Sequence, residues 1–112
     1  GDAVLRHLGR FLLEATRSED VVARFGGEEF VILLVDTSLG EGTAKCEVLI
    51  EGWQRRAEEA ASVLQPLPTL SVGIAEFPAC GDGVHDVFGA AAAALYAAKE
   101  RGRNCVVAAA LR

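Results

Sequence analysis

The sequence predicts one α/β domain, an α+β sandwich in which helices flank a mainly antiparallel central sheet. Apolar patterns of helical and strand type follow one another in the order α, β, β, α, β, α, β. The first two strand patterns are separated only by glycines and glutamates, as in a β-hairpin. With 112 residues the chain has room for one core. We therefore treat residues 1–112 as a single domain.

Three segments carry apolar residues at helical spacing, which predicts helices over residues 3–16, 43–64 and about 84–101. Asp2 precedes the first helix, where its carboxylate can cap the exposed amides. Pro66 and Pro68 stop the second helix, and Gly102 stops the third. The alanine run in the third helix indicates tight packing of this helix.

Four segments rich in β-branched and aromatic residues predict strands over residues 20–25, 29–35, 69–77 and 104–109. The strand at 29–35 is apolar on both faces, which is typical of a central strand. The stretch DTSLGEG after it reads as a loop. Trp53 and Tyr96 fall on apolar helix faces, so we expect them to pack in the core and not to stack on bases.

Composition excludes several classes of protein. The net charge of -5 gives no general attraction to DNA or RNA, so a phosphate-bearing ligand needs local groups or metal ions. The three cysteines are widely spaced, which argues against a disulfide framework or a zinc site and favours the reducing cytoplasm. The sequence contains no bilayer-length apolar run and no signal-peptide pattern, so no membrane contact is expected from this segment.

The stretch VVARFGGEEFVILL holds the residues best suited to chemistry. Gly26 and Gly27 can adopt positive φ and leave the backbone open to a ligand. Glu28 and Glu29 follow at the start of a strand, where adjacent side chains point to opposite faces, so the two carboxylates cannot easily share one task. One of them can bind a hard divalent cation such as Mg²⁺. The alternative is an ordinary turn with solvated acids.

The motif RFGGEEF between two apolar strands resembles the signature of the GGDEF family of diguanylate cyclases, in its GGEEF form. GDAVL at the N-terminus, RSED before the hairpin, SVGIA at 71–75 and ALYAAKERGRN at 94–104 extend the resemblance over almost all of the chain. The resemblance implies a nucleotide-cyclase, palm-like fold. It also implies condensation of two GTP to cyclic di-GMP with release of two pyrophosphates, each GTP being held by one of two facing domains.

By this resemblance Glu28 would ligate Mg²⁺ or Mn²⁺, and Glu29 would lie beside the attacking ribose hydroxyl or the metal, with its role as a base left open. Gly26 and Gly27 would admit the nucleotide. Asp2 matches the aspartate that contacts the guanine edge, which competes with its role as a helix cap.

Lys99 and Arg103 match the family positions that hold the terminal phosphates of GTP. The compact ammonium of lysine and the planar guanidinium of arginine both suit the binding of phosphate. The alternative is favourable placement of two cations at a helix C-terminus.

Arg17 and Asp20 form an RxxD pattern ahead of the hairpin. The resemblance places there an inhibitory site for the product cyclic di-GMP, distinct from the catalytic site. The alternative is a charged turn whose spacing arises by chance.

The sequence departs from the family in two respects. The family's first strand, with a metal-binding aspartate, and its FKxxND-like segment are not found in these residues, so the domain is expected to be N-terminally incomplete and inactive alone. Ala92 stands where the family usually has an acid. The leading interpretation is a cyclase domain, homodimeric when active, with a sensor or receiver domain elsewhere in its parent protein. The alternatives are an inactive domain acting as a cyclic di-GMP receptor and, less favoured, a partner subunit that binds nucleotide.

Overall fold

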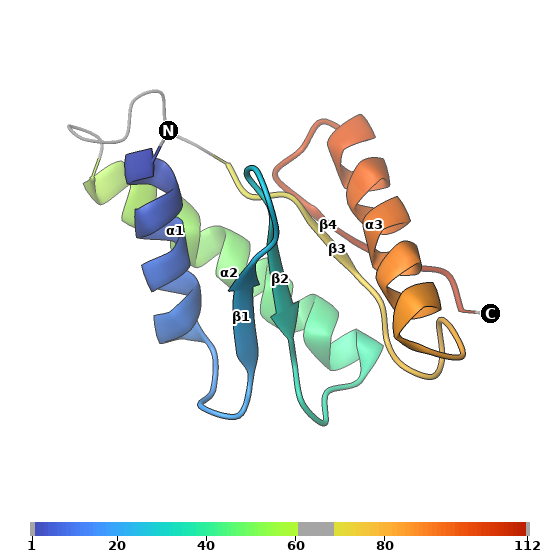
Figure 1. Cartoon of the computed structure of the whole chain (residues 1–112). Coiled ribbons are helices and arrows are strands. Elements are labelled where there is room, and N and C mark those ends of the chain that lie inside the picture. The colour runs from blue at the N-terminus through green and yellow to red at the C-terminus, as the bar shows by residue number, and fades with distance from the viewer. Residues whose placement is uncertain (1, 61–68, 112) are drawn as a thin grey trace.

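The computed structural model describes residues 2–60 and 69–111, with the backbone alone for Asp2 (Figure 1). Its elements follow the order expected from the sequence, which confirms the α/β class. The helices are α1 (Asp2–Ala15), α2 (Leu39–Glu59) and α3 (Val84–Glu100), and the strands are β1 (Val21–Arg24), β2 (Phe30–Leu33), β3 (Val72–Ile74) and β4 (Val106–Ala108). Within the described residues, no helix combines the length and the apolar character needed to span a bilayer.

The start of α2 corrects the prediction, because the helix begins at Leu39 and not at residue 43. The Ser38 side chain accepts a hydrogen bond from the Glu41 backbone N–H at 3.1 Å, and the Glu41 carboxylate accepts one from the Ser38 N–H at 3.0 Å. This capping box satisfies two amides that have no partner within the helix and outweighs the low helix propensity of the nearby glycines. The helix ends at Glu59 with Ala60 as its C-cap, earlier than the predicted end at residue 64, whereas Pro66 and Pro68 lie outside the described residues.

The expected single central sheet is replaced by two sheets of two strands each. β1 and β2 pair antiparallel as a hairpin, whereas β3 and β4 pair parallel, because α3 connects them as a crossover that returns the chain to the same end of the sheet. Within the described residues β2 pairs with β1 alone, and Leu33 is 61% exposed. The prediction of a central strand at 29–35 was therefore wrong for this structure.

The larger core lies between α1, α2 and one face of the hairpin. Its buried members are Leu8, Phe11, Leu12, Leu49, Trp53 and Ala57, and Val22, Phe30 and Ile32 pack against them from the strands. Trp53 is 1% exposed, which confirms its predicted place in the core. In Figure 1, α2 runs behind the hairpin strands, so it backs the element that carries the glycine and glutamate turn.

The smaller core joins α3 to β3 and β4 through Ala94, Ala98 and Val107. A Cβ added at Gly73 would lie 2.2 Å from the Leu95 backbone nitrogen, so helix and strand are in backbone contact. The tight packing predicted from the alanine run is confirmed. Tyr96 lies two positions from both buried alanines, on the opposite side of the helix, and is 58% exposed, so its predicted burial was wrong.

Candidate functional site

The turn between β1 and β2 presents bare backbone to open space. Gly26 and Gly27 have φ values of 63° and 45°, which glycine adopts without steric cost. The Phe25 N–H donates to the Glu29 carbonyl at 2.8 Å, and the Glu29 N–H donates to the Gly26 carbonyl at 3.1 Å. A Cβ added at either glycine would meet no atom within 4 Å. A ligand can therefore approach the main chain of this turn closely.

Arg24 supports the turn from the end of β1, a role that the sequence reasoning missed. Its Nε and Nη2 donate to the Gly27 carbonyl at 3.3 and 2.9 Å. The guanidinium thus stabilises the left-handed backbone of the two glycines. The available signal was the arginine two residues before the glycine pair in RFGGEEF.

The two adjacent acids of the turn have different surroundings. Glu29 Oε2 lies 3.7 Å from Lys99 Nζ in the last turn of α3, and the two side chains are 51% and 39% exposed. Glu28 is exposed and, among the residues that the structure describes, has no ion pair or side-chain hydrogen bond. The structure therefore joins Glu29 to one of the predicted phosphate-binding cations and leaves the carboxylate of Glu28 open to a ligand.

An aromatic pair forms a second link between the hairpin and α3. The ring centroids of Phe25 and Phe88 are 5.1 Å apart with an interplanar angle of 53°, a tilted geometry that aromatic rings favour. Both rings keep substantial exposed surface, 55% and 40% respectively. The link comes from residues that the sequence analysis did not single out.

The segment after α3 carries the second predicted phosphate-binding cation. Gly102, Arg103 and Asn104 all have positive φ, at 106°, 67° and 52°. The Arg103 N–H donates to the Ala98 carbonyl at 3.0 Å, which satisfies a group at the helix end. A left-handed conformation costs a residue with a Cβ roughly 1–2 kcal/mol, and asparagine tolerates it better than arginine. Arg103 is exposed in this unusual conformation.

Comparison with known proteins decides the family. Residues 1–105 match the family model described as diguanylate cyclase, GGDEF domain. The chain belongs to the GGDEF family. It is 38% identical over 111 residues to the diguanylate cyclase DgcM of Escherichia coli, a match that covers 97% of this chain and 25% of DgcM. It is 31% identical over 110 residues to diguanylate cyclase A of Treponema denticola, covering 95% and 28% of the two chains.

The chain thus spans about a quarter of the length of these curated GGDEF relatives. Among solved structures, it is similar to the GGDEF domain of DgcB from Caulobacter crescentus in complex with c-di-GMP, with a TM-score of 0.79 and 30% identity over 96% of this chain and 63% of that one. The GGEEF domain of a Vibrio cholerae diguanylate cyclase matches with a TM-score of 0.82 over 99% and 69%. At 21% identity the second match supports the fold alone.

In this GGDEF domain the RxxD residues lie at the opposite end of β1 from the glycine turn. The Asp20 side chain has no exposed surface. Its oxygens accept hydrogen bonds from the backbone N–H groups of Val35 and Arg17, each at 3.0 Å, and from the Arg17 guanidinium at 3.3 Å. The Val35 and Arg17 bonds lower the pKa of Asp20 below its ordinary value. The carboxylate is therefore satisfied by its own chain.

The Arg17 side chain links the turn before β1 to the turn after β2. It donates to the Val35 carbonyl and to Thr37 Oγ1 at 3.2 Å, and it forms an ion pair with Glu19 at 3.4 Å. The hydrogen bond to Asp20 leads the interactions that raise the pKa of Arg17. The Arg17 side chain is nevertheless 46% exposed, so part of it remains accessible.

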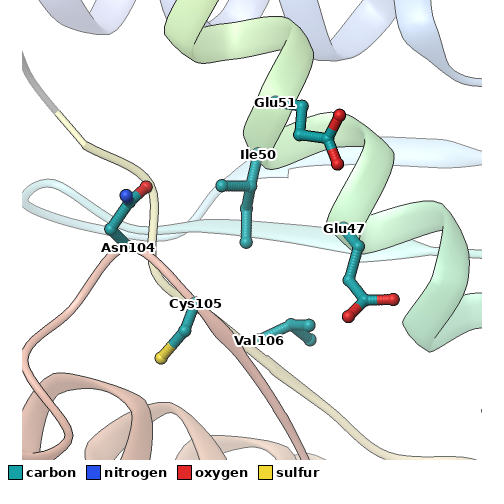
Figure 2. A pocket seen from close by; sticks show the side chains of 6 residues that line it. All are labelled: Glu47, Ile50, Glu51, Asn104, Cys105 and Val106. Carbon is teal, nitrogen blue, oxygen red and sulfur yellow. The ribbon is translucent and has the colours of Figure 1, made fainter.

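Two further features of the domain are the start of α1 and a hollow beside α2. Asp2 is the first residue of α1, and its side chain lies outside the described residues, so the choice between helix cap and guanine contact stays open. A hollow of about 280 Å³ lies between α2 and the start of β4. Figure 2 shows the side chains that line it: Glu47, Ile50, Glu51, Asn104, Cys105 and Val106. This lining contains none of the predicted site residues.

Proposed function

We propose that this chain is the larger part of a diguanylate cyclase domain that binds GTP between the glycine turn and the end of α3. The observation that carries the proposal is the approach of Glu29 and Lys99 to 3.7 Å. These residues come from motifs far apart in the sequence, and both motifs match one nucleotide site by resemblance. A carboxylate and an ammonium beside an open glycine backbone suit a nucleoside triphosphate.

Each residue has a proposed part in binding. Lys99 and Arg103 hold the terminal phosphates, which replace Glu29 as the partner of the Lys99 ammonium. Glu29 then faces the ribose hydroxyl or the metal, while Gly26 and Gly27 let the nucleotide lie against the backbone. The reaction is attack of a ribose 3′-hydroxyl on the α-phosphorus of a second GTP, with pyrophosphate as the leaving group.

The chemistry of Glu28 fits a divalent cation. Mg²⁺ is usually bound by one or two carboxylates, waters and substrate phosphates, and Mn²⁺ accepts similar oxygen ligands. Bound metal would neutralise the charge of the phosphates. The described residues contain no group of three or more His, Cys, Asp or Glu side chains that could hold a metal. We therefore expect metal to bind this chain mainly together with the nucleotide.

The reaction needs two nucleotides held face to face, so the active form is proposed to be a homodimer. We also propose that the domain uses GTP in the cytoplasm and is controlled by a sensor or receiver domain elsewhere in the parent protein. The c-di-GMP in the related DgcB structure supports the same product as a ligand of this chain. Residues 1–112 are proposed to act as one domain that lacks part of the family's catalytic machinery and turns over GTP slowly or not at all by itself.

We place the cyclase ahead of the receptor because of Asp20. Its carboxylate is buried and already accepts hydrogen bonds from Arg17 and Val35, whereas recognition of guanine would require free acceptor positions. Product inhibition at this site would thus begin with the exposed part of Arg17. Titration with cyclic di-GMP of the parent chain and of Arg17→Ala tests this step.

The main test is titration calorimetry of the chain with GTP and Mg²⁺, followed by chromatography of the nucleotides. We expect GTP to bind, Lys99→Ala to weaken binding about tenfold through loss of a charged contact, and Glu28→Gln to reduce the dependence on Mg²⁺. Lys45→Ala on α2 is the matched control and should bind as the parent does. A folded chain that does not bind GTP would overturn the proposal. Sustained formation of cyclic di-GMP would refute only the expected inactivity of the isolated chain.

A further inference from the structure

The turn after α3 has three consecutive residues with positive φ, Gly102, Arg103 and Asn104. Glycine adopts positive φ without steric cost and asparagine tolerates it, but arginine rarely adopts it. Such a conformation persists only where the surrounding structure holds it. Neighbouring groups must therefore hold Arg103 in this conformation.

Two hydrogen bonds hold the backbone at Arg103 and Asn104. On the helix side, its own N–H donates to the Ala98 carbonyl at 3.0 Å. On the strand side, the Asn104 N–H donates to Ser71 Oγ at 3.1 Å. Ser71 immediately precedes β3, whose Val72 N–H donates to the Cys105 carbonyl at 2.9 Å. The hydroxyl of Ser71 is thus anchored by the strand pairing and reaches the backbone of the turn.

The side chain of Arg103 is open to a ligand. It is exposed, and in the described part of the chain it makes no ion pair or side-chain hydrogen bond. Lys99 lies in the turn of α3 just before it. Figure 2 shows Asn104 where this turn enters β4, across the hollow from α2.

We propose that Ser71 is a positioning residue for the phosphate site: by accepting the Asn104 N–H it holds the left-handed turn that presents Arg103 beside Lys99. The inference rests on the proposed function, because it assumes that Arg103 binds phosphate. Ser71 acts only through the backbone and does not touch the ligand. Its loss would keep both Lys99 and Arg103 in the chain but let the turn that presents Arg103 relax.

The test is calorimetric titration of the whole chain with tripolyphosphate and Mg²⁺, using parent, Ser71→Ala, Arg103→Ala and the double variant. Because Ser71→Ala lacks one hydrogen bond to the turn, this variant should bind tripolyphosphate about fivefold more weakly than the parent. In the Arg103→Ala background the same change should have no further effect, because the group that Ser71 positions is already absent. Ser71→Thr, which keeps the hydroxyl, should restore binding, and Ser18→Ala is the matched control on an exposed serine.

The outcomes separate this inference from the proposed function. If the parent binds and Ser71→Ala binds equally well, Ser71 has no positioning role and the proposed function stands. An equal loss in both backgrounds would show a general structural effect and also overturn the inference. If the folded parent binds neither tripolyphosphate nor GTP, both proposals fall. Should Ser71→Ala not fold, Ser71→Cys, a weaker acceptor of similar size, takes its place in the cycle.

Discussion

The half of the domain built by α1, α2 and the hairpin packs differently from the half built by α3, β3 and β4. In the first half, large side chains meet: Trp53 and Phe11 are buried with ring centroids 5.7 Å apart. In the second half, small residues let backbones touch, as where Gly73 meets the backbone of Ala91 and Leu95. Contacts between large side chains can adjust through rotamers, whereas contacts between backbones cannot. The two halves should therefore respond to different substitutions.

The largest effect is expected in the first half. Trp53→Ala removes the most buried large side chain and leaves a cavity, so the free energy of unfolding should fall by about 3–5 kcal/mol. Trp53→Phe keeps most of the ring volume and should cost less. Urea unfolding followed by circular dichroism measures both. A loss below about 1 kcal/mol for the alanine variant would mean that this core collapses around the gap.

The second half is tested by adding one methyl group. Gly73→Ala places a Cβ 2.2 Å from the Leu95 nitrogen and 2.3 Å from the Ala91 carbonyl oxygen, so we expect a loss of about 2–3 kcal/mol as α3 moves away. Gly89→Ala, in the same helix with no atom within 4 Å, should instead gain up to about 1 kcal/mol. The same unfolding experiment compares them. Equal effects would contradict backbone contact as the cause.

A pH experiment sharpens the comparison for the polar turn that closes the first half. The pKa of Asp20 is lowered in the folded chain from its ordinary value of 3.8. At a pH above 3.8 the ionised carboxylate therefore stabilises the fold. This contribution is lost as the pH falls through the lower native pKa. The melting temperature of Asp20→Asn should lie several degrees below that of the parent at neutral pH, and the difference should shrink as the pH falls below 3.8. Glu58→Gln, an exposed acid on α2, should show no such convergence.

The smallest effect concerns the ion pair between the halves. Glu29 and Lys99 are both partly exposed, so a double-mutant cycle with Glu29→Gln and Lys99→Gln should give a coupling of about 0.2–1 kcal/mol that decreases in high salt. Thermal unfolding at two salt concentrations measures it. A coupling that is larger and insensitive to salt would show that the halves are joined by a desolvated contact.

Local signals predicted much of this structure. Helical spacing located α1 and α3, and the glycine pair located the hairpin turn. The start of α2 was missed because the stretch DTSLGEG was read as a loop. The signal for a helix start was present there, since Ser38 and Glu41 form a capping box. The exposure of Tyr96 was missed because an alanine-rich helix shows little contrast between its faces, so its buried side was decided by contact with β3 and β4.

The sequence by itself determined the family, the order of the elements and the residues that carry the proposed chemistry, because motifs and periodicity depend on neighbours along the chain. Only the tertiary structure decided that Glu29 meets Lys99, that Asp20 is buried against Arg17, and that Ser71 accepts a hydrogen bond from the Asn104 N–H. It also decided that the strands form two separate pairs. These contacts join segments far apart in sequence, and their geometry depends on how whole helices and strands pack.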